Sequence, residues 1–259
     1  MELKHARDTI VRYGQELSRL NEEKNEFMGI AAHDLRNPLS AIKGYAEMVV
    51  EDGQALVQGA VSDIAASGQE LQANGRRIGD TAGRMAEMVQ NLLDANRIER
   101  GEMQLNLAPT DLGAALHQVI ETQRPHAAVK QQTIHQSGDE ASVLVLADAG
   151  VTVQVLENLV SNAVKYSPPG KEIFVRLRRQ DQGVRVEVRD EGPGLSAEDQ
   201  KKLFGKFARL SAKPTGGEHS TGLGLSIVKK MVEAMNGRVW CESEPGRGAT
   251  FIVELPVSA

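Results

Sequence analysis

The sequence predicts an α plus α/β protein, in which a helical hairpin forms a dimeric four-helix bundle and an α/β sandwich domain follows it. Three observations lead to this fold class. Apolar residues recur at helical spacing over about the first 100 residues. A turn signal at residues 52–53 divides that stretch into two long helices, which suits a hairpin. From about residue 102 onward, strand-like alternation is interleaved with shorter helical patterns.

The N-terminal heptad pattern predicts a coiled coil and therefore a dimer. The alternative is a lone amphipathic helix that packs on its own domain. The first helix is expected to continue to Asp52-Gly53, which should break it, and a second helix should follow. The expected seam residues are Leu3, Ala6, Ile10, Tyr13, Leu17, Leu20, Lys24, Phe27 and Ala31 in the first helix, and Ile64, Gly68, Leu71, Gly75, Ile78, Ala82, Met85, Val89 and Leu92 in the second.

The remainder of the chain mixes helices and strands. Thr110-Asp111 has the composition of a helix N-cap. A stretch rich in glycine and proline is expected to form a mobile loop at residues 205–221. We expect strands at residues 102–108, 142–147, 173–179, 183–189, 238–242 and 250–255, and helices at residues 112–130, 151–166 and 225–235.

Composition excludes several functional classes. A net charge of −5 and the lack of a basic tract make nucleic acid an unsuitable partner. Cys241 is the single cysteine, which excludes an internal disulfide and a thiolate metal site and suits a reducing, cytoplasmic compartment. No apolar run approaches the roughly 18 residues of a membrane span, so we expect no membrane contact by this segment itself.

The first motif centres on a histidine of the first helix. His33 lies off the apolar seam and should be partly exposed. A neutral imidazole, whose ordinary pKa is near 6.5, can attack a phosphoryl group, and Asp34 could orient the ring and accept its proton. Asn37 lies one turn further along the same face, and Pro38 should kink the helix. In isolation, an ordinary surface histidine is the alternative.

The second motif places polar side chains on one face of a later helix. Asn158 and Asn162 are one turn apart, and Lys165 and Tyr166 extend their face. An amide oxygen is a hard ligand suited to Mg²⁺, and Lys165 could meet a phosphate. A polar helix surface without function is the alternative.

The third motif follows a predicted strand. Asp190 begins the run Asp-Glu-Gly-Pro-Gly, and a carboxylate there can accept a hydrogen bond from the amino group of adenine. Gly192 and Gly194 would let the backbone approach a planar base. A plain acidic turn is the alternative.

The fourth motif opens a helix. Gly222, Leu223, Gly224 and Leu225 follow the expected loop, and free N–H groups at a helix N-terminus bind phosphate. The motif is neither a dinucleotide fingerprint nor a P-loop, because no strand precedes it and the Gly-Lys-Ser/Thr ending is absent.

Taken together, these motifs resemble those of the sensor histidine kinases of bacterial two-component systems. Residues 27–39 resemble the H-box, residues 157–167 the N-box, residues 190–194 the G1 box, residues 203–207 the F-box and residues 220–225 the G2 box. The resemblance covers essentially the whole chain, in the family's order and spacing.

The resemblance implies three segments. Residues 1–26 would be a coiled-coil signalling helix. Residues 27–101 would be the dimerisation and histidine phosphotransfer domain, and residues 102–259 the catalytic ATP-binding domain with the Bergerat fold.

The resemblance also implies roles for the motif residues. His33 would be the phosphoacceptor and Asp34 its base, while Asn37 stands where the family positions a hydrolytic water, which allows phosphatase activity. Asn162 would bind Mg²⁺, helped by Asn158. Asp190 would recognise adenine, and Lys165, Tyr166 and Arg209 would face the phosphates. The implied ATP-binding set is completed by Gly192, Gly194, Thr221, Gly222, Leu223, Gly224 and Leu225.

The implied activity is ATP-dependent autophosphorylation on His33, followed by phosphotransfer to an aspartate in the receiver domain of a response regulator. The implied cofactors are ATP and Mg²⁺, and the implied assembly is a homodimer, with a membrane tether allowed in a longer protein. One alternative is a non-catalytic signalling scaffold that binds ATP. Another is an ATPase or serine kinase of the same fold, which would have no use for the His33 hairpin.

Overall fold

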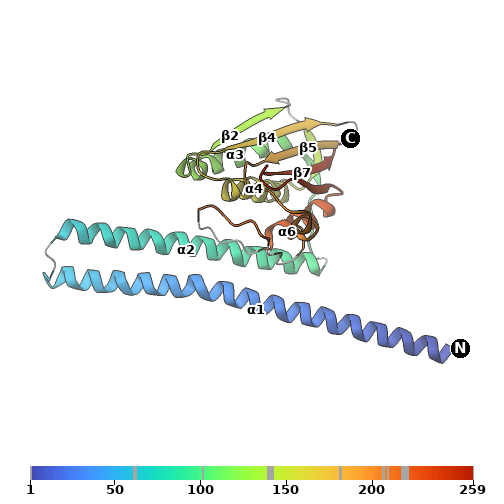
Figure 1. Ribbon diagram of the computed structural model, residues 1–259, viewed down its shortest axis with the longest axis horizontal. Helices are drawn as coiled ribbons and strands as arrows, with labels where there is room; N and C mark the ends of the chain where they lie inside the picture. The colour runs from blue at the N-terminus through green and yellow to red at the C-terminus, as the bar shows by residue number, and fades with distance from the viewer. Residues whose placement is uncertain are drawn as a thin grey trace. The chain divides into compact units, whose positions relative to one another are not determined.

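The computed structural model describes residues 2–60, 63–100, 102–138, 143–180, 183–205, 208, 210–216 and 222–258 (Figure 1). It divides into two compact units, residues 1–92 and residues 93–259. No helix in these described ranges is long and apolar enough to cross a membrane.

The first unit is a hairpin of helix α1 (Glu2–Val57) and helix α2 (Ile64–Glu99), where α2 continues into the second unit. The predicted break at Asp52-Gly53 is wrong, because α1 continues to Val57. A glycine inside a helix costs only about 1 kcal/mol relative to alanine, which a long helix can absorb.

The end of α1 is instead set by Gly59. This residue has a φ of 68°, a conformation that glycine adopts without steric cost. The N–H groups of Gly59 and Ala60 donate to the carbonyls of Leu56 and Ala55, which is the Schellman arrangement at a helix C-terminus. The end of α1 therefore depends on Gly59, which takes the positive φ needed to form these two hydrogen bonds.

Helix α1 also continues on both sides of Pro38.

The predicted coiled-coil seam of α1 lies mostly outside the described side chains. The backbone is helical throughout this stretch. Tyr13 is the one predicted seam residue before position 35 whose side chain is described, and it is 63% exposed in the single chain. The coiled coil therefore stays a prediction.

The face of α2 that is least exposed differs in part from the predicted seam. Leu71, Ile78 and Met85 are half-buried as expected, but Gly68 and Gly75 are exposed. Buried polar residues lie among the apolar ones: Asn74 and Thr81 are 5% and 3% exposed. Arg77 donates to Asn74 Oδ1 at 3.0 Å and lies over the ring of Tyr45 on α1, and Arg84 donates to Thr81 Oγ1 at 2.8 Å. The arginines thus satisfy the polar groups that the hairpin buries.

The second unit contains a five-stranded sheet in the order β2-β4-β5-β7-β6 and a small sheet of β1 and β3. In the large sheet β2 and β4 run parallel, and the remaining neighbours are antiparallel. The strands are β1 (Ala108–Asp111), β2 (Thr133–Gly138), β3 (Leu144–Ala147), β4 (Glu172–Arg179), β5 (Gly183–Arg189), β6 (Arg238–Ser243) and β7 (Ala249–Pro256).

Helices α3 (Leu112–Val129), α4 (Ala149–Tyr166) and α6 (Gly224–Ala234) cover one face of the large sheet, and α4 packs against both other helices (Figure 1). Alternate residues of β4, such as Val175 and Leu177, are buried on that side, whereas Arg176 and Arg178 are exposed. This is the alternation expected of a sheet with one covered and one solvated face. The core lies between the sheet and the helices, and its largest fully buried side chains include those of Leu116, Ile120, Leu156, Leu159, Ile173, Met231 and Leu255.

Three elements differ from the sequence prediction. Residues 102–107 are not a strand, because the partner strand β3 has only four residues and pairs with Ala108–Asp111. Strand β2 was not predicted, since Ile134 is its one buried residue and leaves no alternating pattern. Helix α5 (Ala197–Lys202) was also missed; it has six residues, too few to show a period.

Candidate functional site

Helix α4 carries the predicted polar face on a well-buried support. Asp148 caps the helix by accepting a hydrogen bond from Val151 N at 3.1 Å. One side of the helix is buried in the core, while Asn158, Asn162, Lys165 and Tyr166 are all half-exposed. The helical spacing therefore places all four on one face of the helix, as predicted, and that face lies at the border between core and solvent.

The two asparagines contact one another. Asn162 Nδ2 donates to Asn158 Oδ1 at 3.0 Å. This bond orients the Asn162 amide so that its oxygen, at the other end of the group, points away from Asn158. Asn162 therefore offers a hard oxygen of the kind that suits Mg²⁺, and Asn158 acts on it through the hydrogen bond.

Asp190 follows strand β5 and is 4% exposed. Its Oδ1 accepts hydrogen bonds from Gly192 N at 2.8 Å and Ala249 N at 3.1 Å. Burial raises the pKa of Asp190, and the two N–H groups and the charge of Arg189 oppose that shift only in part. A buried acidic group with one oxygen held in place is suited to recognising a ligand with the other.

The loop after Asp190 is pressed against neighbouring backbone. An added Cβ at Gly192 would lie 2.9 Å from the carbonyl oxygen of Tyr166, and one at Gly194 would overlap the carbonyl oxygen of Glu244. The turn between β6 and β7 holds this loop, since Gly246 N donates to the carbonyl of Pro193 at 2.7 Å. The third motif is therefore more than an acidic turn, because its residue Gly192 packs closely against Tyr166 at the end of α4.

The fourth motif begins α6. Leu223 precedes the helix and its side chain does not cap it, and N–H groups at the start of a helix are suited to an anion. Leu223 is buried, and Gly222 and Leu225 are half-exposed. Gly224 lies directly on α4, because an added Cβ would be 2.5 Å from Asn158 Nδ2 and 3.0 Å from Asn158 Oδ1. The second and fourth motifs thus touch.

Gly224→Ala is expected to weaken nucleotide binding roughly 10-fold. The added methyl group must displace the Asn158 amide, which then loses its hydrogen bond with Asn162. Calorimetric titration with ATP measures the effect. Gly83→Ala on α2 is the matched control, since no described residue lies within 4 Å of a Cβ there. Unchanged affinity in both variants would contradict the role of this contact.

The structure does not locate every predicted residue. His33 and Asp34 belong to α1, but their side chains lie outside the described part of the protein. Arg209 and Thr221 lie wholly outside the described residues. Asn37 is exposed on α1, one helical turn after His33. Their roles stay predictions.

Ala249 is a contributor that the sequence analysis missed. Its N–H and carbonyl both pair with Asp190, the carbonyl accepting from Asp190 N at 2.9 Å. Because the two residues are far apart in sequence and the contact uses backbone atoms, no local signal could have indicated it.

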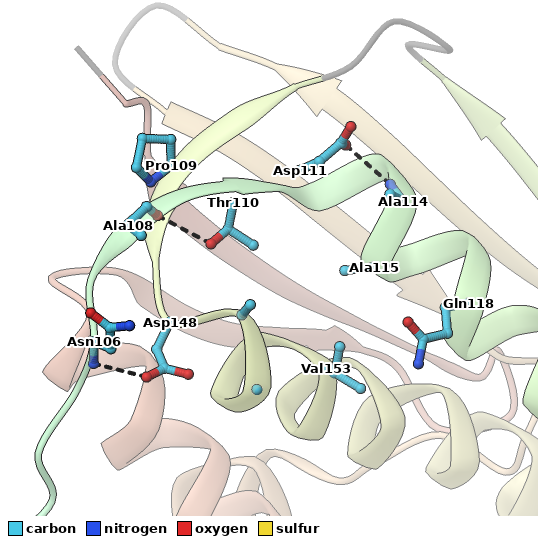
Figure 2. Close-up of a pocket in the computed structure, with 12 residues that line it drawn as sticks. Asn106, Ala108, Pro109, Thr110, Asp111, Ala114, Ala115, Gln118, Asp148 and Val153 are labelled. Atoms are coloured by element: carbon cyan, nitrogen blue, oxygen red, sulfur yellow. Dashed lines mark hydrogen bonds between the residues drawn. The ribbon is translucent and has the colours of Figure 1, made fainter.

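A cavity of about 570 Å³ lies elsewhere in the second unit, between the starts of α3 and α4 (Figure 2). Its walls include the N-caps Asp111 and Asp148, and Asn106 N donates to Asp148 Oδ2 at 2.9 Å. Burial opposes ionisation of Asp148, but the N–H groups of Val151, Asn106 and Gly150 hold its pKa below the ordinary value. None of the predicted nucleotide-binding residues that the structure describes lines this cavity.

Comparisons with known protein families agree with the site. Residues 147–259 match the family described as histidine kinase-, DNA gyrase B-, and HSP90-like ATPase. Residues 23–101 match the His Kinase A (phospho-acceptor) domain. The first match contains Asn158, Asn162, Asp190 and Gly224, and the second contains His33.

Similar proteins point to the same class. The adaptive-response sensory kinase SasA of Thermosynechococcus vestitus is 32% identical over 264 residues, which cover 99% of this chain and 67% of SasA. The crystal structure of full-length ShkA in complex with AMPPNP is 26% identical, with a TM-score of 0.62 and coverage of 86% of this chain and 46% of ShkA. The histidine kinase ThkA in complex with the response regulator protein TrrA is 22% identical, with a TM-score of 0.60 and coverage of 90% and 61%; this likeness concerns the fold.

This chain belongs to the sensor histidine kinase family. It spans 37% of the length of one curated relative that it matches and 67% of the length of a second, SasA.

Proposed function

We propose that this protein phosphorylates itself on His33 with the γ-phosphate of ATP and then transfers the phosphoryl group to an aspartate of a response regulator. The observation that carries the proposal is the contact between the second and fourth motifs, in which Gly224 at the start of α6 lies against Asn158 on α4. The buried carboxylate of Asp190 supports it, as does the family match that includes His33.

The residues fit ATP and Mg²⁺ chemically. Asp190 offers a buried acceptor for the adenine amino group, and the start of α6 offers N–H groups for phosphate. Asn162 would hold Mg²⁺ through its amide oxygen, with Asn158 orienting it. When bound, the metal neutralises charge on the phosphates during transfer. Lys165, Tyr166, Arg209 and Thr221 complete the proposed ATP-binding set.

In the proposed reaction, a ring nitrogen of His33 forms a bond to the γ-phosphorus of ATP. The bond from that phosphorus to the bridging oxygen breaks, and ADP leaves with the electron pair. Asp34 orients the imidazole and takes its proton. The chain contributes mainly position and charge, which is what phosphoryl transfer requires.

Incubation with γ-labelled ATP tests this function. A phosphorylated histidine carries a phosphorus–nitrogen bond, so the label should be lost in acid and kept in alkali. An unlabelled protein that still binds ATP would indicate a signalling scaffold, and an alkali-labile label would indicate a serine kinase.

Asn37→Ala is expected to leave autophosphorylation largely intact but to slow dephosphorylation of the regulator. Asn37 is exposed one turn after His33 on α1, where its amide can hold a hydrolytic water. Label on the chain and label on the regulator are followed separately over time. A parallel loss of both activities would make Asn37 structural.

We also propose a homodimer in which the hairpins form a four-helix bundle. Gly68 was expected to lie on the apolar seam of the second helix, but it is exposed, and nothing in the described hairpin lies within 4 Å of a Cβ at Gly68. That expectation is wrong, because the least exposed face of α2 includes Asn74 and Thr81 instead. In the proposed bundle a second chain covers Gly68, which is exposed in the single chain.

Gly83→Ala is expected to stabilise the protein by roughly 0.5–1 kcal/mol, and Gly68→Ala by less. Both gain helix propensity, but an added methyl group at Gly68 would crowd a second chain. Thermal melts at one protein concentration compare them, since dimer stability depends on concentration. Equal stabilisation would show that no second chain packs at Gly68.

The proposed domain organisation is a signalling helix at residues 1–26, a dimerisation and phosphotransfer domain at residues 27–101 and an ATP-binding domain at residues 102–259. We propose that this segment works in the cytoplasm, with a receiver domain as its partner. The complex of ThkA with its response regulator supports that kind of partner.

A further inference from the structure

The C-terminal end of α4 is held by side chains that none of the four motifs contains. The last carbonyls of a helix have no partner within the helix and need donors from elsewhere. Here the carbonyl of Val164 accepts from Lys130 Nζ at 2.8 Å, and that of Lys165 accepts from the same nitrogen at 3.1 Å. Gln132 Nε2 donates to the carbonyl of Ser167 at 2.6 Å.

Lys130 directly follows α3 and brings a positive charge to the end of α4. A cation is favoured there by the helix dipole. An ammonium group has three N–H donors, and a third acceptor, the hydroxyl oxygen of Thr215, lies 2.7 Å from Lys130 Nζ. Lys130 therefore connects α4 to the chain segment between α5 and α6.

Thr215 fastens that segment to α4 by two of its groups. Its N–H donates to the carbonyl of Lys165 at 3.0 Å. Its hydroxyl lies 2.7 Å from the carbonyl of Ser167 and 3.0 Å from that of Lys165, and its one proton can be donated to either. Thr215 Oγ1 thus accepts from Lys130 while donating to α4.

The position of this anchor matters for the candidate site. Thr215 lies at the end of α4 that carries Lys165 and Tyr166, and Gly224 lies against Asn158 on the same helix. Thr215 and Gly224 therefore both contact α4. We expect the contacts of Thr215 to act together with the packing of α6 on α4 in setting where the start of α6 lies.

We propose that Lys130 and Thr215 are a positioning pair for nucleotide binding, in which Lys130 holds the Thr215 hydroxyl on the C-terminal carbonyls of α4. The pair touches no nucleotide itself and acts through α4 and the start of α6. This inference rests on the proposed function, because it assumes that ATP binds at that site.

Thr215→Val removes the hydroxyl at nearly constant shape, and Lys130→Met removes the ammonium. Each variant of the 259-residue chain is expected to bind ATP roughly 3- to 30-fold more weakly, with KM for ATP rising more than kcat falls. Thr215→Ser and Lys130→Arg keep the donors and should restore most of the affinity. The free-energy loss in the double variant should be smaller than the sum of the two single losses, because both substitutions break the shared contact between Lys130 and Thr215.

Two control variants match these changes. The hydroxyl of Thr122 donates to the carbonyl of Gln118 within α3, so Thr122→Val removes a threonine hydroxyl that serves its own helix. Lys202 pairs with Glu198 on the surface, so Lys202→Met removes a lysine charge whose partner lies in its own helix. Both should bind ATP like the wild type.

The measurement is calorimetric titration with ATP, together with thermal melts of each variant. If Thr215→Val melts and binds ATP like the wild type, or if the two effects add fully in the double variant, the inference is overturned. A Lys130→Met variant that melts earlier but binds normally also overturns it. Failure of the wild type itself to bind ATP would overturn the proposed function. If Asp190→Asn loses ATP binding while the Lys130 and Thr215 variants bind ATP normally, the proposed nucleotide site stands and only the positioning pair is overturned.

Discussion

Replacing His33 with glutamine is expected to reduce ATP-dependent labelling of the chain to background and to leave ATP affinity nearly unchanged. Glutamine is similar in length and tolerated in a helix, but its amide nitrogen is not a nucleophile. His33 belongs to α1 in the first unit, whereas Asp190, Asn158 and Gly224 belong to the second. Loss of the acceptor should therefore not disturb the nucleotide site.

Autoradiography with γ-labelled ATP and calorimetry with ATP give the two readouts. Labelling of the His33→Gln variant at the wild-type rate would remove His33 from the reaction. In the wild type the initial rate should fall below about pH 6.5, because an imidazole of ordinary pKa then becomes protonated and loses its nucleophilic electron pair. A flat rate through that range would contradict attack by a neutral histidine.

Replacing Asp190 with asparagine is expected to raise the dissociation constant for ATP roughly 10- to 100-fold. The asparagine oxygen can still accept from Gly192 N and Ala249 N, as Oδ1 of the aspartate does. The other end of the group then presents N–H donors where adenine also presents a donor. For the same reason the wild type should prefer ATP to GTP, whose base has an acceptor at that position. Equal affinity for both nucleotides would remove Asp190 from adenine recognition.

The stability of the Asp190→Asn variant separates this effect from misfolding. Burial raises the pKa of Asp190, so the folded chain holds that proton more tightly than the unfolded chain does. The ionised group therefore costs stability, and this cost develops as pH rises from the ordinary carboxyl value to the raised one. An uncharged asparagine avoids the cost, so its unfolding temperature at neutral pH should not fall. A large fall would instead indicate that the loop is disrupted.

The spacing of residues along the chain was enough to predict which side chains share a helix face and which residue caps a helix. The positions of Asn158, Asn162, Lys165 and Tyr166 on one half-exposed helix face follow from the helical period alone. The N-cap role of Asp111 was also predictable, and the structure confirms it through the hydrogen bond from Ala114 N. These are interactions between near neighbours, which composition and periodicity describe well.

Predictions failed where the outcome depended on a partner distant in sequence or on one backbone conformation. The strand expected at residues 102–108 begins only at Ala108, because the length of β3 sets the length of the pair. The helix expected to break at Asp52-Gly53 ends at Val57, because Gly59 provides the positive φ that closes its last turn. A residue's propensity does not show which of several glycines will terminate a helix.

The sequence by itself determined the class of protein and the order of its motifs, since these depend on residue types at short spacings along the chain. Only the tertiary structure decided which groups meet: Ala249 with Asp190, Gly224 with Asn158, and Lys130 with Thr215. The physical reason is that each of these contacts joins elements far apart in the chain. The first uses backbone N–H and carbonyl groups, the second requires a residue without a Cβ, and the third depends on one flexible ammonium group. Pairing of β5 with β7 brings the first pair together and packing around α4 brings the other two, and no local pattern records the result.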